Sequence, residues 1–424
     1  MTPEGWRDVS ILDVADVASG QVDPRETPYC DWPLVAPNHI EEGSGRLLPA
    51  FSAAAQGAIS GKYMFQPGDV LYSKIRPYLR KVALPRFSGL CSADMYPLRS
   101  NGGIEPGFLF AMLLSKEFTE FASSVSMRTG IPKINREELA KYRCSLPPLP
   151  EQRKIAAILS SVDDAIEASQ VVIDQIQVVK KAMMAELLTK GLPGRHKRFK
   201  QTEIGEVPED WEIRRVDGLA APAPYSCVGG PFGSDLTTKD YVSSGVPVIR
   251  GANLNGPGRW MVEREFVFVS QEKAKALLRN LAYPGDIIFT QRGTLGQVAR
   301  IHPASGGHCF VLSQSQMKLT VNAEVADPDF VTFYFESPQA LDMIVRATVA
   351  TGIPHINLGI LRGFLVPIPP REEQRQIAES LDASECRGVA EGNKLKALSE
   401  LKSALMSVLL TGEVRVRVDE DAAA

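Results

Sequence analysis

The chain has 424 residues, more than one hydrophobic core usually serves, so its length predicts two or three domains. Hydrophobic residues make up 44% and charged residues 23% of the chain, which is the composition of a folded globular protein and argues against disorder. The net charge of −3 argues against a protein that coats nucleic acid, but it is compatible with local basic patches.

Residues 1–148 are predicted to form a mixed α/β domain, because short apolar segments alternate with Gly and Pro. From Lys62 to Arg99 this domain carries seven basic residues against two acidic ones. The turn Pro67-Gly68-Asp69 introduces a β-rich strand within that segment. Four basic residues follow the strand, interleaved with Tyr72 and Tyr78, and are candidates for nucleic-acid contact: Lys74, Arg76, Arg80 and Lys81. The alternative for each of them is a solvated surface charge.

Residues 149–192 are predicted to form one long helix. Pro150 and Glu151 suit its first turn, where a proline is tolerated and an acidic side chain favours the positive end of the helix dipole. Apolar residues then follow alternately four and three positions apart from Ile155 to Leu187, which is the period of a coiled coil. About forty helical residues would span roughly 60 Å. The alternative is a bundle helix inside an ordinary domain.

Residues 193–210 are expected to form a linker, followed by a second mixed α/β domain over residues 211–368. The basic run from Gly194 to Lys200 in the linker is equally compatible with phosphate contact and with a solvated surface. Arg and Lys read guanine in the major groove, whereas Asn and Gln read adenine. On that basis the second domain supplies four candidate contacts: Arg250, Asn253, Gln291 and Arg292.

Residues 369–412 are predicted to form a second long helix, and residues 413–424 a C-terminal tail. Ile377, Leu381 and Leu395 belong to its apolar pattern. Gly388 and Gly392 interrupt the pattern, so we expect a kink or looser packing in the middle of this helix.

The chain repeats itself, and this is the strongest signal in the sequence. The segment Thr-Gly-Ile-Pro-Lys-Ile-Asn at 129–135 recurs as Thr-Gly-Ile-Pro-His-Ile-Asn at 351–357, and the offset of 222 holds without a gap through both predicted helices. Upstream, the offset grows from 205 between Trp6 and Trp211 to 221 between Ser92 and Ser313. The two front parts therefore differ by insertions, while the helices keep their length. Two helices of equal length most economically pack antiparallel, so we predict an α+β protein with a pseudo-two-fold repeat.

The repeated Thr-Gly-Ile-Pro loop cannot distinguish two different ligands, so we interpret it as structural or as a turn that positions a phosphate. His302, His308 and Cys309 lack a fourth metal ligand, which favours a structural interpretation. Nucleotide-binding, nucleophile-elbow and adenine-methyltransferase motifs are missing from the sequence. The six cysteines never take Cys-x-x-Cys spacing, no apolar run is long enough to span a membrane, and the N-terminus is unlike a signal peptide, so we expect a cytoplasmic protein.

Several motifs together resemble the specificity subunits of type I restriction-modification enzymes. They are Pro-Pro-Leu-Pro-Glu-Gln-Arg-Lys-Ile-Ala at 147–156, its partner near the C-terminus, Ile-Gly-Glu-Val-Pro-Glu-Asp-Trp at 204–211, and Gly-Pro-Phe-Gly-Ser at 230–234 followed by Gly-Val-Pro-Val-Ile-Arg-Gly at 245–251. The resemblance covers essentially the whole chain and is specific as a combination. The first domain departs from the pattern, because it has no clear counterpart of the segment at 230–234.

The resemblance implies two target-recognition domains, over 1–148 and 211–368, each reading one half of a split double-stranded DNA site. It implies that the two helices act as spacers and bind two methyltransferase (modification) subunits, which would use S-adenosylmethionine to methylate adenine and would recruit motor-nuclease (restriction) subunits. The chain itself would bind no cofactor and no metal and would have no catalytic residues.

Two other functions remain open at this point. One is a coiled-coil adaptor whose heads bind proteins, against which the basic segment argues, and a salt-dependent DNA shift would separate it from a DNA reader. The other is an enzyme, which a methyltransferase assay on the isolated chain would detect.

Overall fold

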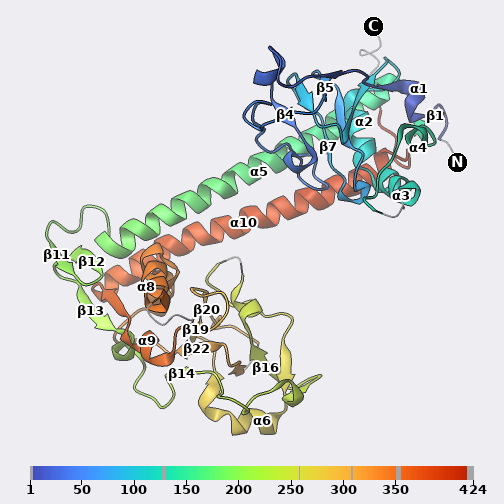
Figure 1. The fold of residues 1–424 in the computed structure, drawn as a ribbon. Helices are drawn as coiled ribbons and strands as arrows, with labels where there is room; N and C mark the ends of the chain where they lie inside the picture. Colours follow the sequence, from blue (N-terminus) through green and yellow to red (C-terminus); the bar gives the residue numbers. More distant parts are fainter. Residues whose placement is uncertain (1–2, 127–129, 257, 307–308, 350–354, 418–424) are drawn as a thin grey trace. The chain divides into compact units, whose positions relative to one another are not determined.

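The computed structural model describes residues 3–126, 130–256, 258–306, 309–349 and 355–417. The chain divides into two compact units, Met1–Ser169 with Lys394–Ala424 and Gln170–Asn393. Each unit consists of one α/β domain, here called head one and head two, together with half of each long helix (Figure 1). The predicted α+β class, with two mixed heads and two long helices, is confirmed.

Head one is built on two small sheets and one strand pair. The first sheet is antiparallel and has the order β2 (Ala15–Val17), β9 (Met95–Ser100), β6 (Val70–Ser73) and β7 (Val82–Ala83). The second sheet has the order β3 (Gln21–Val22), β5 (Lys62–Phe65), β8 (Gly89–Cys91) and β4 (Leu34–Val35), and its last pair is parallel. Strands β1 (Arg7–Ser10) and β10 (Arg143–Leu146) join the two ends of the head.

The described residues of head one also form the short helices α1 (Ile11–Val14), α2 (Pro106–Leu114), α3 (Lys116–Val125) and α4 (Arg136–Ala140). Their ends follow local rules. Pro106 occupies the first turn of α2, Ser115 caps α3, and Asn135 and Glu138 form a capping box at α4. Helices α2 and α3 pack on the first sheet, and the resulting core extends to residues of both long helices: Ile155, Leu159, Met406 and Leu409.

Head two repeats this scaffold. The sheet β14 (Cys227–Gly229), β22 (Gln316–Leu319), β19 (Ile287–Thr290) and β20 (Val298–Arg300) has the same order and pairing as the first sheet of head one. The pair β13 (Glu212–Arg215) and β23 (Leu365–Ile368) matches β1 and β10. Helices α7 (Pro328–Glu336), α8 (Pro338–Val349) and α9 (Leu358–Gly363) match α2, α3 and α4.

The second sheet of head two is larger than that of head one. It has five strands in the order β15 (Tyr241–Val242), β17 (Val267–Val269), β16 (Val246–Ile249), β21 (Phe310–Leu312) and β18 (Leu281–Ala282), and α6 (Gln271–Ala276) follows β17. The parallel pair β16 and β21 corresponds to β4 and β8, so β15 and β17 are additions to the repeat. These additions account for part of the growing offset between the two copies. The linker contains a hairpin of β11 (Phe199–Thr202) and β12 (Gly205–Pro208).

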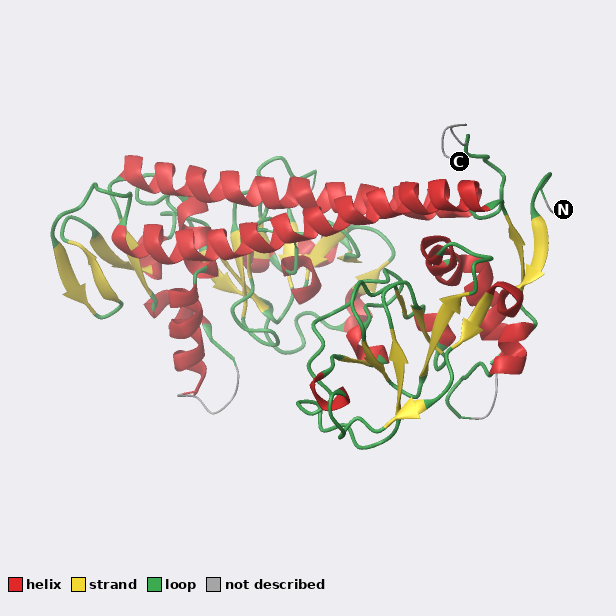
Figure 2. Cartoon of the chain, turned by 90° about the horizontal axis from the view of Figure 1, so that it is seen from above, coloured by secondary structure: helices red, strands yellow, loops and turns green. Residues whose placement is uncertain are grey.

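The two long helices are α5 (Leu149–Lys190) and α10 (Arg371–Leu409), each drawn without interruption in Figure 2. Within each unit, one half of α5 packs antiparallel to one half of α10. Lys180 contacts Glu385 in one unit, and Asp163 contacts Lys402 in the other. These two ion pairs are equivalent in the repeat, because both partners are 222 positions apart.

The middle of α10 does not show the helix break that the two glycines of this helix could have caused. The helix continues through Gly388 and Gly392. A Cβ atom at Gly388 would lie 3.4 Å from Cγ2 of Ile176, which is an ordinary van der Waals distance, so this glycine faces Ile176 of α5. At Gly392 a Cβ atom would meet nothing within 4 Å, so a side chain there would point into open space.

Candidate nucleic-acid interface

The basic candidates of head one lie where strand β6 ends. The backbone N–H of Arg76 donates to the carbonyl of Pro132 at 2.8 Å, and the N–H of Ile134 donates to the carbonyl of Lys74 at 2.9 Å. Residues 130–135 of the repeated loop therefore hold this segment in place. This agrees with the structural interpretation of the loop. Thr129, the first residue of the repeat, lies outside the described residues. Burial lowers the pKa of Lys74, with help from the charge of nearby Lys133.

The structure separates the four candidates of head one by what they contact. Arg80 donates through Nε, at 3.1 Å, and through its terminal nitrogen to the carbonyl of Leu114, at the end of α2. Lys81 donates to the carbonyl of Pro37 at 2.9 Å. Arg76 is exposed and has a φ of 49°, as the left-handed backbone of a tight turn requires. Of the two interleaved tyrosines, Tyr78 is exposed and Tyr72 belongs to the core.

In head two, the side chain of Asn253 is engaged within its own turn. Its side chain is buried, its oxygen accepts from the N–H of Arg250 at 2.9 Å, and its nitrogen donates to the carbonyls of Val262 and Arg264 at 3.1 and 3.0 Å. The amide therefore has no free donor left for adenine, because it organises the turn η6 (Gly251–Leu254). Arg250 donates to the carbonyl of Glu265 at 2.9 Å and so supports the same loop.

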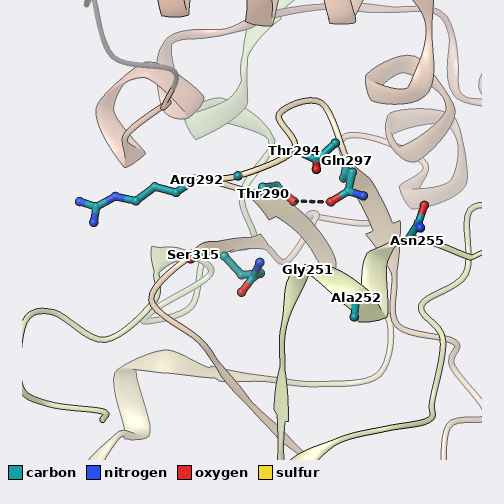
Figure 3. A pocket seen from close by; sticks show the side chains of 10 residues that line it. Gly251, Ala252, Asn255, Thr290, Arg292, Thr294, Gln297 and Ser315 are labelled. Atoms are coloured by element: carbon teal, nitrogen blue, oxygen red, sulfur yellow. Dashed lines mark hydrogen bonds between the residues drawn. The ribbon is translucent and has the colours of Figure 1, made fainter. Parts of the chain in front are cut away.

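Gln291 and Arg292 lie on the loop between β19 and β20. The N–H of Gln291 donates to the carbonyl of Ser315 at 2.7 Å, and its carbonyl accepts from Ile356 at 3.1 Å. This second contact repeats the loop arrangement of head one, although Thr351 to Pro354 lie outside the described residues. The side chain of Arg292 is exposed and points away from Thr290 and Gln297 (Figure 3).

A pocket of about 410 Å³ opens beside this loop. It is formed by three segments that are distant in the sequence: the turn η6, the β19–β20 loop and the start of β22. The lining residues are Gly251, Ala252, Asn255, Thr290, Arg292, Gly293, Thr294, Gln297, Ser315 and Gln316 (Figure 3). Sequence reasoning found Arg292 alone among them, because strand pairing and not sequence proximity brings Gln316 to this place.

The repeated Glu-Gln pair at the start of each long helix turns out to join the elements of its unit. Glu151 accepts from Nε1 of Trp6 at 3.2 Å and from Arg415 at 2.8 and 2.9 Å. Glu373 accepts from Nε1 of Trp211 at 3.3 Å and contacts Nε2 of His196 at 2.8 Å. In each unit the glutamate lies at the start of one long helix. It contacts a tryptophan at the beginning of the head and a residue that follows the end of the other long helix.

The neighbouring glutamines make a second matched pair of contacts. Gln152 accepts from the N–H of Glu105 and donates to the carbonyl of Pro147, both at 2.8 Å. Gln374 accepts from Asp327 at 2.7 Å and donates to Pro369 at 2.8 Å. Glu105 and Asp327 are the N-caps of α2 and α7, so each glutamine fixes a head helix to the adjacent long helix.

In unit two, further charged side chains surround the ion pair that the two units share. Arg259 is 5% exposed and contacts three acidic residues: Asp329 on α7 at 3.0 Å, Glu385 on α10 at 3.3 Å, and Asp382 on α10. Lys180 on α5 contacts Glu385 at 2.6 Å and Glu336 on α7 at 3.4 Å. The cluster thus connects an inserted loop of head two to both long helices. At the positions equivalent to Asp329 and Glu336, head one has Gly107 and Leu114.

The described residues contain no group of three or more His, Cys, Asp or Glu side chains that could hold a metal ion. His302 packs edge-on against Trp260 with a centroid distance of 4.5 Å, and its Nδ1 accepts from the N–H of Ala304. The suggested partner His308 lies outside the described part of the chain. Nor does any described helix combine the length and apolarity needed to cross a membrane.

Comparison with known proteins identifies the family. The specificity subunit of the type I restriction enzyme EcoDI from Escherichia coli is 42% identical over 153 residues, which is 36% of this chain and 34% of that protein. The specificity subunit of the enzyme MjaVIII from Methanocaldococcus jannaschii is 28% identical over 338 residues, 78% of this chain and 75% of that protein. The chain thus spans about a third of the first relative's length and three quarters of the second's.

The fold is also that of a solved relative. The crystal structure of the type I restriction-modification system S subunit from M. genitalium matches with a TM-score of 0.59 at 14% identity, covering 95% of this chain and 96% of that one. The model of the type I restriction modification DNA specificity domain matches residues 3–178 and 208–388. Because these two regions make up most of the chain, the protein belongs to the family of type I restriction-modification DNA specificity subunits and carries two copies of the family's domain.

Proposed function

We propose that the chain determines the DNA recognition site of a type I restriction-modification enzyme by reading one half of a bipartite double-stranded site with each head. The observation that carries this proposal is the repeat itself. Two heads share one scaffold but differ in the loops that follow equivalent strands, at Lys74 to Arg76 and at Gln291 to Arg292. A common scaffold with different polar loops suits the recognition of two different sequences.

The candidate residues divide into contacting and supporting groups. Lys74 and Arg76 in head one, and Gln291 and Arg292 in head two, are proposed to contact DNA. Arg80, Lys81 and Arg250 hold backbone carbonyls in the structure and are proposed to shape these loops and to contribute positive charge near phosphates.

The long helices are proposed to bind two methyltransferase (modification) subunits. Both helices leave apolar side chains exposed: Val178 on α5 is 70% exposed and Leu401 on α10 is 47% exposed. Single exposed apolar residues are common, but Val171, which lies seven residues before Val178 on the same face of α5, is exposed as well, and grouped apolar side chains favour contact with a partner. The methyltransferase subunits would supply S-adenosylmethionine chemistry on adenine, and motor-nuclease (restriction) subunits would join through the assembled complex.

The test is DNA binding by the chain assembled with its modification subunits, followed by mapping of methylated adenines. We expect a single split sequence to be methylated and the affinity to fall steeply with salt. The proposal would be contradicted by a complex that methylates DNA without sequence preference. It would also be contradicted if the two heads bound proteins but did not bind DNA. A saturated complex with only one modification subunit would contradict the proposed stoichiometry.

A further inference from the structure

Three cations of head one gather around the ring of Tyr96. The ammonium group of Lys74 lies 5.2 Å from the centre of this ring, and the guanidinium carbon of Arg136 lies 6.0 Å from it. Lys133 is close to both, because it pairs with Ile75, the residue after Lys74, in a short antiparallel bridge. Burial lowers the pKa of Lys74, and the positive charges of Lys133 and Arg136 lower it further. The three side chains, which come from two separate segments, therefore repel one another.

The surrounding residues supply little negative charge to this cluster. In the described part of the chain no carboxylate lies within 4.0 Å of any of the three cations. Asp94 is near enough for its charge to oppose the repulsion at Lys74, and Glu138 is engaged in the capping box of α4. Arg136 donates to the carbonyl of Ala18 at 3.4 Å. Cations that repel one another and lack a carboxylate partner leave N–H donors available to an anion.

The scaffold does not require these charges, because head two builds the same place without them. Lys74 and Gln291 are equivalent, since the carbonyl of each accepts from an isoleucine N–H of the repeated loop. Lys133 stands at the one position where the two copies of that loop, 129–135 and 351–357, differ. The positions of head two that correspond to Lys74, Lys133, Arg136 and Tyr96 hold Gln291, His355, Leu358 and Met317. The cluster is therefore specific to head one, and the folding of the common scaffold does not explain it.

We propose that Lys74, Lys133 and Arg136 bind one phosphate group of the DNA backbone in the half-site read by head one. The inference rests on the proposed function and adds Lys133 and Arg136 to its DNA contacts. A single lysine or arginine is enough to bind the edge of a guanine, whose acceptors carry only partial charge. Three full positive charges around one ring suit a full negative charge instead. The site positions head one on the DNA and does not itself distinguish sequences.

The first experiment measures how tightly the assembled complex binds its methylated sequence and unrelated duplexes over a range of salt concentrations. Lys133→Gln and Arg136→Leu each remove one cation, and the second introduces the residue of head two. We expect each variant to bind every sequence about tenfold more weakly, and the slope of log affinity against log salt to fall by about one. Lys116→Gln is the control, because this exposed lysine of head one already pairs with Glu120 at 3.6 Å. It should change neither quantity.

The second experiment removes the charge from the DNA and leaves the protein unsubstituted, so it holds even where a variant fails to fold. A neutral methylphosphonate replaces each phosphate of the two half-sites in turn. At one position in the half-site of head one it should weaken binding, and at that position it should cost the Lys133→Gln complex much less.

Three results would overturn the phosphate site. They are an unchanged affinity and salt slope in both variants, the lack of any sensitive phosphate in that half-site, and a changed base preference at one position, which would indicate a base contact. The proposed function would still stand in each case. It fails by itself if the unsubstituted complex selects no sequence at all.

Discussion

A single buried carboxyl group of head two makes the charged cluster sensitive to pH. Burial raises the pKa of Glu336 to about 7, against the opposing charge of Lys180 and with support from Glu385. The ordinary value is 4.5, so between these two values the unfolded chain releases a proton that the folded chain retains. The contribution of Glu336 to stability is therefore complete below pH 4.5 and is lost as the pH rises through about 7.

Glu336→Gln should remove this pH dependence, because glutamine resembles the protonated carboxyl. Lys180 keeps its partner Glu385 at 2.6 Å. We expect the variant to gain about 2 kcal/mol of unfolding free energy relative to the unsubstituted chain between pH 5 and pH 8. Thermal denaturation across this range measures the difference. Glu379→Gln, which removes an exposed carboxyl from α10, should show no such trend, and an equal gain in both variants would disprove the assignment.

The two equivalent glutamates at the starts of the long helices should differ in importance. Glu373→Ala leaves the buried Trp211, the N–H of Leu192 and His196 without their acceptor, so we expect a loss of about 3 kcal/mol in unit two. Glu151→Ala should be milder by about half, because its partner Arg415 is 44% exposed and regains water. Hydrogen exchange read separately at the starts of α5 and α10 compares the two, and a larger loss for Glu151→Ala would contradict this ranking.

Residue chemistry alone selected some of the residues around the candidate site and missed others. Arg292 lies on an exposed loop directly after a strand that the repeat marks clearly, so its type and position were enough to select it as a candidate. Asn253 has the same kind of side chain as a base reader, but three hydrogen bonds within its own loop use the whole amide. Gln316 gave no signal, because strand pairing with Thr290 and not its place in the sequence brings it to the pocket.

At the scale of elements, prediction succeeded where the order is local. The first long helix follows from the heptad pattern of its own sequence, and the internal repeat extends the prediction to the second helix, whose pattern is interrupted. The heads consist of strands of two to six residues whose partners are distant in the sequence. No local pattern could give the sheet orders, nor the addition of β15 and β17 to head two.

Arg259 is predicted to position head two on the long helices. Arg259→Met leaves Asp329, Asp382 and Glu385 close together without their common cation, which should destabilise unit two by about 3 kcal/mol. On DNA we expect both half-site sequences to persist while the complex accepts a wider range of gaps between them. Methylation of a site library with varied gaps measures this. Arg387→Met, on the exposed side of α10, is the matched control, and identical gap tolerance in both variants would exclude a positioning role.

At the scale of the whole molecule, the repeat places equivalent contacts at equivalent positions. The pair Lys180 and Glu385 corresponds to Lys402 and Asp163, and the hydrogen bond from Trp211 to Glu373 corresponds to that from Trp6 to Glu151. Equal offsets through both long helices mean that a length change in one helix disturbs its pairing with the other. Length is therefore the property that the helices preserve while the heads diverge, as expected of a spacer.

Removing one heptad from each helix tests whether they set the gap between half-sites. Lys180 faces Glu385 and Ile176 faces Gly388, so residues 172–178 of α5 lie opposite residues 387–393 of α10. Deleting 172–178 alone shortens α5 by roughly 10 Å and puts the remaining pairs out of register, so we expect binding to be lost. Deleting both segments restores the facing pairs, including Lys180 with Glu385. The double deletion should bind again.

The rescued complex should methylate the same two half-sites separated by a gap about three base pairs shorter, since each base pair adds about 3.4 Å. Because neither deletion touches a head, a change in half-site sequence would show that the heads do not act independently of the helices. Mapping methylated adenines on a library of gap lengths gives both quantities in one measurement. If the doubly shortened chain bound DNA with the original gap, the length of the helices would not determine the distance between the half-sites. The partner subunits would then have to set this distance.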